Sequence, residues 1–439
     1  MINYLKEEAF GITKRLLKRD FSGETGLAVK NSIFQFSTNV VSKIGSLLFT
    51  VILARLLLPE KFGLYSLALS TIILIGGFSD LGIGTTLVRY VSRENKKAGG
   101  YIKYLAKLKI TLTLLVSLVL IGSAYWLANN FYSKPIFYAL LAGSIYILSV
   151  SFTGFIASIF QAENNFKWPL FKEIFFQILR LVILPLTILF TIGYSTELFL
   201  MYIFIALSVC YLISLFFLIP RLKKYTGDSL KSKQKEEVNK YILPLSATVL
   251  SGVFFGYIDT IMLGRFVASE FLAYYQAAFA LASSAIVLVS FSAVLFPIFS
   301  RISGKRLRVG LKKSIFVTIP LSILAMVGTI LIAPFIVNLV YGTEYSPAIL
   351  LLRVLALIFI TDPLIGIFSS YHYSQGNTKK VAKAVIFSTG VNIILNYTFI
   401  TYLLATTGSM YNAVLGAAAA TLISRSVYLG LLIIGKKKL

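Results

Sequence analysis

Apolar segments of about 20 residues or more recur along the whole chain, and the gaps between them alternate in charge. Every second gap is rich in Lys and Arg, whereas the intervening gaps are short and contain acids. A soluble fold gives no reason for this alternation, but a chain threaded through a membrane does, because short basic loops stay cytoplasmic. The basic gaps contain Lys96, Lys97 and Lys103, the lysines of residues 223–235 and the basic residues of 301–313, and Lys436, Lys437 and Lys438 close the chain; the acidic gaps contain Glu60, Glu197, Glu270 and Glu344.

The net charge of +25 alone would suggest a nucleic-acid partner, but the composition argues against one. The chain is 57% hydrophobic and 13% charged, with a mean hydropathy of +0.83, which is more apolar surface than a soluble domain needs. We therefore expect the positive charge to anchor the protein against anionic membrane lipids, with no nucleic acid bound. The single cysteine, Cys210, excludes an intrachain disulfide.

The pattern predicts an all-α polytopic membrane protein with twelve transmembrane helices and both termini cytoplasmic. Residues 1–30 are too polar for a cleavable signal peptide and are amphipathic, so we expect an interfacial helix there; a disordered basic tail is the alternative. The expected organisation is a cytoplasmic amphipathic segment (1–30), an N-terminal six-helix lobe (31–220), a cytoplasmic linker (221–240) and a C-terminal six-helix lobe (241–439). The expected spans are 31–57, 63–90, 104–128, 135–160, 171–192, 197–219, 241–266, 271–299, 314–340, 347–374, 381–404 and 411–435.

The two halves of the chain resemble each other. Each first span ends on a similar tetrapeptide, LARL at residues 53–56 and LGRF at residues 263–266, and a glutamate and a tyrosine follow at matching distances. Because six spans is an even number, both halves enter the membrane from the same side, which gives a parallel repeat. Transporters place a substrate path between such repeats. Chance similarity between apolar sequences is the alternative.

Several charged residues lie within the predicted spans, where each would cost roughly 2.5–3.5 kcal/mol if it faced lipid at mid-depth. They must therefore face one another or a hydrated cavity. Polar stripes at helical spacing favour a central cationic cavity over scattered ion pairs such as Lys43 with Asp80 or Arg353 with Asp362. The predicted substrate-binding cations are Lys43, Arg55, Arg180, Arg265, Arg353 and Arg425, and the predicted polar lining is Gln35, Asn39, Gln177, Asn392 and Asn396.

A cavity with more cations than acids suits a phosphate or pyrophosphate group, for which Arg is the preferred donor. Among the acids, Asp259 is the leading candidate for coupling to Na⁺ or H⁺, followed by Asp80 and Asp362. The only histidine, His372, is expected to have an ordinary interfacial role. The sequence has no Walker loop, no metal-ligand cluster and no nucleophile elbow, so we expect no cofactor, no bound metal and no enzymatic activity.

Residues 54–65 (ARLLLPEKFGLY) and 78–84 (FSDLGIG) resemble the start of the polysaccharide transporters, the Wzx-type flippases of the multidrug/oligosaccharidyl-lipid/polysaccharide (MOP) exporter superfamily. Residues 259–265 (DTIMLGR) look like the seventh span of the same family. The resemblance implies two six-helix lobes around a cleft that opens alternately to each side. It also implies export of polyprenyl-(pyro)phosphate-linked oligosaccharides, driven by an ion gradient or the membrane potential. The related lipid II flippases have fourteen spans, and a count of twelve argues against that branch.

The leading hypothesis is therefore a monomeric flippase in the cell membrane, which moves a lipid-linked oligosaccharide from the cytoplasmic to the outer leaflet. A multidrug or cation antiporter of the same superfamily is the first alternative, although such a pump should have an acidic cleft. A polytopic glycan polymerase or ligase is the second alternative. The predicted outer loops are short and leave little room for its active site.

Overall fold

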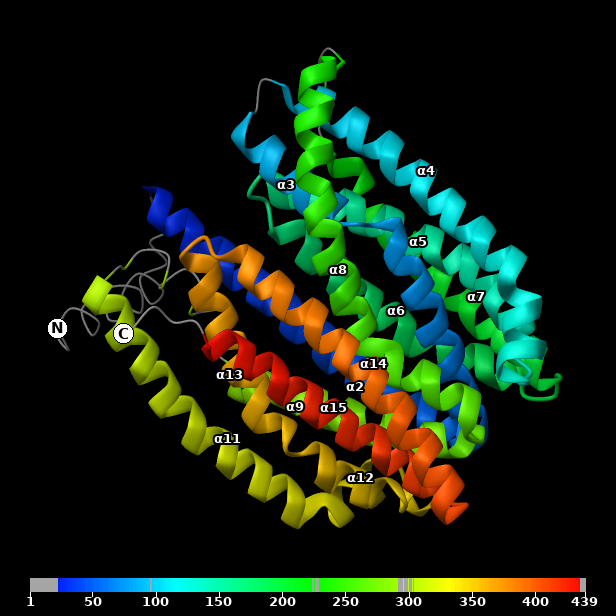
Figure 1. Cartoon of the computed structure of the whole chain (residues 1–439). Coiled ribbons are helices and arrows are strands. Elements are labelled where there is room, and N and C mark those ends of the chain that lie inside the picture. Colours follow the sequence, from blue (N-terminus) through cyan, green and yellow to red (C-terminus); the bar gives the residue numbers. More distant parts are fainter. Residues whose placement is uncertain are drawn as a thin grey trace.

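The computed structural model describes residues 23–94, 97–222, 225, 229–290, 295, 299, 302 and 304–434. Within these residues the chain is helical and has no strand, which confirms the predicted all-α class (Figure 1). The predicted amphipathic segment lies outside the described residues up to position 22, as do the three C-terminal lysines. Residues 23–30 form the start of the first described helix.

The helices form two groups that correspond largely to the two halves of the chain, except that the start of α8 lies beside α3 of the N-terminal half (Figure 1). Residues 232–240, placed in the linker by the sequence, are the helical start of α8. The N-terminal half contains α2 (Gly23–Gly76), η1 (Gly77–Ser79), α3 (Ile83–Arg93), α4 (Ala98–Tyr125), η3 (Trp126–Tyr132), α5 (Phe137–Ala162), α6 (Lys167–Thr191), α7 (Thr196–Ser214), η4 (Leu215–Phe217) and η5 (Ile219–Arg221). The C-terminal half contains α8 (Ser232–Phe266), α9 (Ser269–Val289), α11 (Gly304–Val340), η6 (Thr343–Tyr345), α12 (Ala348–Leu355), α13 (Ile358–Ser374), α14 (Thr378–Thr407) and α15 (Met410–Ile433).

Ten helical stretches in the described part of the chain are long and apolar enough to cross a membrane. The longest stretch, Ile33–Arg93, is broken at Leu58, where the backbone turns to φ 59° immediately before Pro59. Proline lacks the N–H that a continuing helix needs, so the chain reverses direction there. The helix α9 is not among the ten stretches. If the broken stretch is counted as two spans and α9 is included, the total is twelve transmembrane spans. This number of spans stays a prediction.

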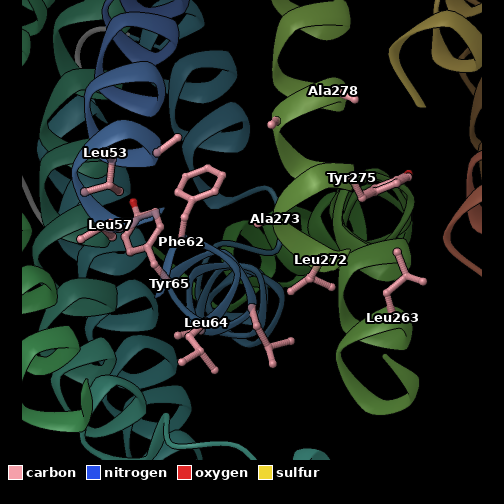
Figure 2. Packing of buried hydrophobic residues seen from close by; sticks show 14 of the residues in the cluster. Leu53, Leu57, Phe62, Leu64, Tyr65, Leu263, Leu272, Ala273, Tyr275 and Ala278 are labelled. Carbon is pink, nitrogen blue, oxygen red and sulfur yellow. The ribbon is translucent and has the colours of Figure 1, made fainter. Parts of the chain in front are cut away.

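The hydrophobic core joins the two halves at one end and is divided at the other. The largest cluster of buried side chains draws on both halves, and Figure 2 shows Phe62 and Tyr65 of α2 opposite Leu272 and Tyr275 of α9. A second cluster combines the N-terminal half with the start of α8, and a third belongs to the C-terminal half alone. We call the end that contains Leu58, Lys134, Phe266 and Tyr341 the joined end, and the end that contains Arg93, Ala162, Ser232 and Gly304 the split end.

Candidate functional site

A cavity of ≈ 870 Å³ is lined mostly by helices of the N-terminal half, and α8 of the C-terminal half completes its wall. Toward the middle of the helices its wall is apolar, with Ile72, Ile147 and Val253 among the lining side chains. Toward the split end the wall becomes polar. The polar side chains there are Asp80, Thr85, Arg89, Lys109, Ser158 and Gln161.

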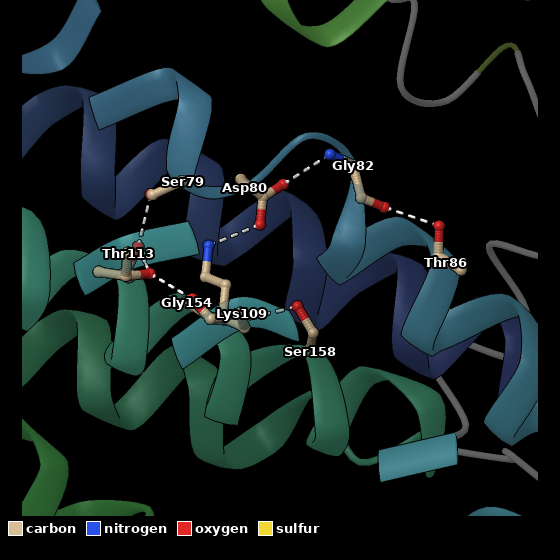
Figure 3. A network of polar contacts seen from close by, with 9 residues as sticks. Ser79, Asp80, Gly82, Thr86, Lys109, Thr113, Gly154 and Ser158 are labelled. Carbon is tan, nitrogen blue, oxygen red and sulfur yellow. Dashed lines mark hydrogen bonds and ion pairs between the residues drawn. The ribbon is translucent and has the colours of Figure 1, made fainter. Parts of the chain in front are cut away.

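An ion pair stands on the polar wall of this cavity (Figure 3). Lys109 Nζ lies 2.9 Å from Asp80 Oδ1, and the Lys109 side chain is 4% exposed whereas that of Asp80 is 42% exposed. The N–H of Gly82 donates to the other Asp80 oxygen at 3.3 Å. Gly82 has a positive φ of 80°, a conformation that glycine adopts without steric cost, and the turn thereby fixes the Asp80 carboxylate. The paired lysine is buried, and the carboxylate reaches the cavity.

The alternative of a Lys43–Asp80 ion pair is wrong, because Asp80 pairs with Lys109. Lys109 was not among the predicted site residues. The signal that could have identified it is the run of Lys109, Thr113 and Ser117 at steps of four, all buried on one face of α4.

A row of hydrogen-bonded side chains follows α6 where it packs against α2. Lys172 Nζ lies 3.1 Å from Glu173 Oε2, and Gln177 Nε2 donates to Glu173 Oε1 at 2.7 Å. Arg180 Nη2 donates to Gln177 Oε1 at 2.5 Å and to Ser46 Oγ of α2 at 3.4 Å. The structure thus brings together the predicted residues Gln177 and Arg180.

The charge of Arg180 is buried without a carboxylate partner. Only 9% of the residue is exposed, and its guanidinium lies 4.3 Å from the ring centroid of Phe49 and 5.3 Å from that of Phe176. Among the described residues no carboxylate is within ion-pairing distance, and Nε has no hydrogen-bond partner. Two aromatic faces stabilise the cation, but they leave a donor available to an anion.

The C-terminal half contains a buried cluster of oxygen atoms around Asp259, which is 6% exposed. Asp259 Oδ2 accepts from Tyr275 Oη at 2.7 Å and from Thr421 Oγ1 at 2.5 Å, and Asp259 Oδ1 accepts from Asn396 Nδ2 at 2.5 Å. The side-chain oxygens of Asn392 and Asn396 are buried and have no partner among the described residues. Asn396 Nδ2 also donates to the backbone carbonyl of Asn392 at 3.0 Å, so the predicted residues Asp259, Asn392 and Asn396 are connected through Asn396.

Arg425 and Asp362 form an ion pair between α15 and α13. The Arg425 guanidinium also lies 5.5 Å from the ring centroid of Phe255 and 5.8 Å from that of Phe279. One Asp362 oxygen and Arg425 Nε are buried without a hydrogen-bond partner.

The alternative of an Arg353–Asp362 ion pair is therefore wrong. Arg353 is exposed, and its Nε donates to Ile330 O of α11 at 3.2 Å. That carbonyl lacks its usual helical donor because Pro334, four residues later, has no N–H. Arg353 compensates for the missing hydrogen bond.

Arg55 and Arg265 are also exposed and bind backbone carbonyls. Arg55 Nε donates to Val340 O at 2.7 Å and its Nη2 donates to Leu339 O, whereas Arg265 Nη1 donates to Phe131 O at 2.6 Å. Both lie at the joined end, and the structure does not bring them into contact with Arg180 or Arg425.

The other predicted site residues of the first span make none of these contacts, although Ser46 of the same span accepts from Arg180. Gln35 Nε2 donates to Asn39 Oδ1 at 3.2 Å, and Lys43 is exposed with no ion pair among the described residues. The predicted cations are therefore distributed over several places, and a single central cationic cavity stays a prediction.

We compared the chain with models of known protein families. A family model described as polysaccharide biosynthesis protein matches residues 28–303. The chain belongs to this family. The resemblance noted in the sequence is thereby confirmed. A second model, MatE, matches residues 244–398, and no curated protein matches the chain.

Solved structures with the same fold include an inward-facing multidrug resistance MATE family transporter of the MOP superfamily, with a TM-score of 0.70, 16% identity and coverage of 91% of this chain and 94% of that one. The lipid II flippase MurJ in an inward closed conformation gives a TM-score of 0.70, 18% identity and coverage of 91% and 87%. A third structure is a MOP superfamily transporter from Pyrococcus furiosus, whose binding pocket is described as having reverse polarity. It gives a TM-score of 0.57 and 15% identity, with coverage of 94% of this chain and 96% of that one. The chain is thus a multi-pass membrane protein with the fold of the MOP transporters.

Proposed function

We propose that the protein moves a polyprenyl-(pyro)phosphate-linked oligosaccharide from the cytoplasmic to the outer leaflet of the cell membrane by alternating access. The observation that carries this proposal is Arg180, a buried cation with an unused donor and no carboxylate partner. An unpaired buried charge is costly, and a phosphate group passing between the halves would offset that cost. Membership in the polysaccharide biosynthesis family agrees with such a cargo.

The split end faces the cytoplasm in this proposal. Basic residues gather there, as the positive-inside rule requires. A core that is divided at this end leaves the halves free to admit a head group from the cytoplasmic side. The basic residues of the split end include Arg93, Lys97, Lys103, Lys107, Lys167, Arg221, Lys231, Lys235, Lys305, Arg308, Lys312 and Lys379.

The cluster around Asp259 is the site at which a coupling ion, Na⁺ or H⁺, would bind. The cluster offers a carboxylate and two hydroxyls, with two amide side chains nearby in the hydrogen-bond network, and such oxygen ligands suit a hard cation. The buried, unpartnered oxygens of Asn392 and Asn396 are available for this purpose. The membrane potential would add about 2.3 kcal/mol per charge per 100 mV to outward movement of the anionic head group.

A multidrug exporter is the second candidate. The MatE match covers residues 244–398, and this segment contains the buried carboxylate of Asp259 and the half-buried carboxylate of Asp362, which could receive an organic cation. Asp362 is already neutralised by Arg425, however, and Asp259 is enclosed by hydrogen-bond donors.

The two candidates are separated by reconstituting the purified protein in liposomes with either cargo. Transfer of a pyrophosphate-linked oligosaccharide to the opposite leaflet, without uptake of a fluorescent organic cation, is the expected result. Uptake of the cation with no transfer of the lipid-linked sugar would assign the protein to the multidrug class.

A further inference from the structure

Charged side chains from each half bind the ends of helices in the other half. Arg265, at the end of α8, donates to Phe131 O in the last turn of η3 at 2.6 Å. Lys134, just beyond η3, donates back to Gly264 O at 2.9 Å and to Val267 O at 3.0 Å. The exchange is reciprocal. Lys134 is half-buried, and this burial lowers the pKa of its ammonium, as does the nearby charge of Arg265.

The same exchange occurs a second time with the halves interchanged. Arg55, in the first span of the N-terminal half, donates to Leu339 O and Val340 O, the last carbonyls of α11. Tyr345, just beyond α11, donates back to Ala54 O at 3.0 Å. Arg55 and Arg265 occupy equivalent positions in the internal repeat, as do Ala54 and Gly264.

The accepting carbonyls explain why arginine stands at these positions. The last carbonyls of a helix have no partner within the helix and carry its negative partial charge. A guanidinium satisfies them with directed donors and a complementary charge. All these bonds lie at the joined end and cross from one half to the other, so they must break if the halves separate there.

We infer that Arg55 and Arg265 form a pair of symmetry-related latches that hold the joined end closed and set the balance between the two transport states. These arginines act on the conformational equilibrium and not on the cargo. The inference rests on alternating access but on neither proposed cargo, and it can therefore fail or succeed independently of the flippase proposal.

Distances between spin labels test the latches. With Cys210 replaced by Ser, cysteines at Tyr194 and Thr407, both exposed at the joined end of opposite halves, are labelled in the full chain in nanodiscs. Arg55→Gln and Arg265→Gln should each enlarge the long-distance population by about fivefold, and the double variant should enlarge it further, because each loses charge-assisted hydrogen bonds.

Arg353→Gln is the matched control, since Arg353 also binds a helix carbonyl but within one half. It should leave the distances unchanged. If the Gln variants do not fold, Arg55→Lys and Arg265→Lys keep the charge, lose the forked geometry and should give a smaller shift in the same direction. An unchanged distribution in the double variant, or an equal shift in Arg353→Gln, would overturn the inference.

Discussion

The backbone of Gly63 lies against the backbone carbonyl oxygen of Ser269, across the boundary between the two halves. A Cβ at position 63 would come closer than 3.0 Å to that oxygen, an approach that real Cβ atoms do not show. A Cβ at Gly264 would likewise come closer than 3.0 Å to the side chain of Leu67. Small residues allow close helix crossings in membranes, so the joined end is closed by backbone contact as well as by the arginines.

Replacing Gly63 by Ala should prevent full closure of the joined end. A cysteine at the buried position Ala273 should then react several times faster with a membrane-impermeant maleimide added at that end. Gly122→Ala is the control, because a Cβ there meets nothing within 4 Å. Equal reactivity in both variants would show that the close contact does not govern closure.

Leu58 has a φ of 59° and a ψ of 171°, a region that only glycine occupies easily. Its side chain is 57% exposed, so little packing is lost on truncation. Leu58→Gly should raise stability by about 1 kcal/mol in thermal unfolding of the solubilised protein. The neighbouring Leu56→Gly should lower it by about the same amount, because that residue is helical. Destabilisation by both variants would contradict the strain at Leu58.

Replacing either member of the Asp80–Lys109 ion pair should lower the stability of the protein, but by different amounts. Asp80→Asn leaves the buried Lys109 charge without its partner and should cost about 3 kcal/mol in thermal unfolding. Lys109→Met leaves a carboxylate that water reaches, and it should cost clearly less. A double variant that is more stable than Asp80→Asn alone would support this explanation. An equal loss in the two single variants would contradict it.

Much of the architecture could be predicted from the sequence, because span length and loop charge are local properties. The break at Pro59 and the polar stripes of α6, α14 and α15 are of this kind. The sequence identifies Asp259, Asn392 and Asn396 as separate candidate residues. It does not show that they are connected, because a pattern along one helix does not reveal which faces of α8 and α14 meet.

The roles of the cations were harder to predict. Arg55 donates to carbonyls that lie 284 and 285 residues later in the chain. Arg353 donates to a carbonyl of another helix that a proline leaves without its usual donor. A charge count treats such residues as cavity cations, although their partners are backbone atoms that no pattern of side chains reveals. Lys109 was overlooked despite its polar stripe.

Asp259→Asn should remove the dependence of transport on the coupling ion. The variant keeps the shape of the cluster but loses the charge that binds Na⁺ or H⁺. Transfer of lipid-linked oligosaccharide in liposomes, measured with and without a sodium or pH gradient, is the test. Asp362→Asn, which breaks only the pair with Arg425, should retain the ion dependence. A gradient response that persists in Asp259→Asn would remove this residue from the coupling site.

The central claim is that the buried charge of Arg180 receives the phosphate group of the cargo. The most direct measurement is the rate at which the Arg180→Gln variant transfers a pyrophosphate-linked oligosaccharide across the membrane of liposomes. The control is Arg221→Gln, which removes an exposed cation stacked on Trp168. We predict a fall of about tenfold or more for Arg180→Gln, since charge-assisted hydrogen bonds contribute about 1.5–3 kcal/mol. The rate should be nearly unchanged for Arg221→Gln. Undiminished transfer by a folded Arg180→Gln protein would contradict the claim.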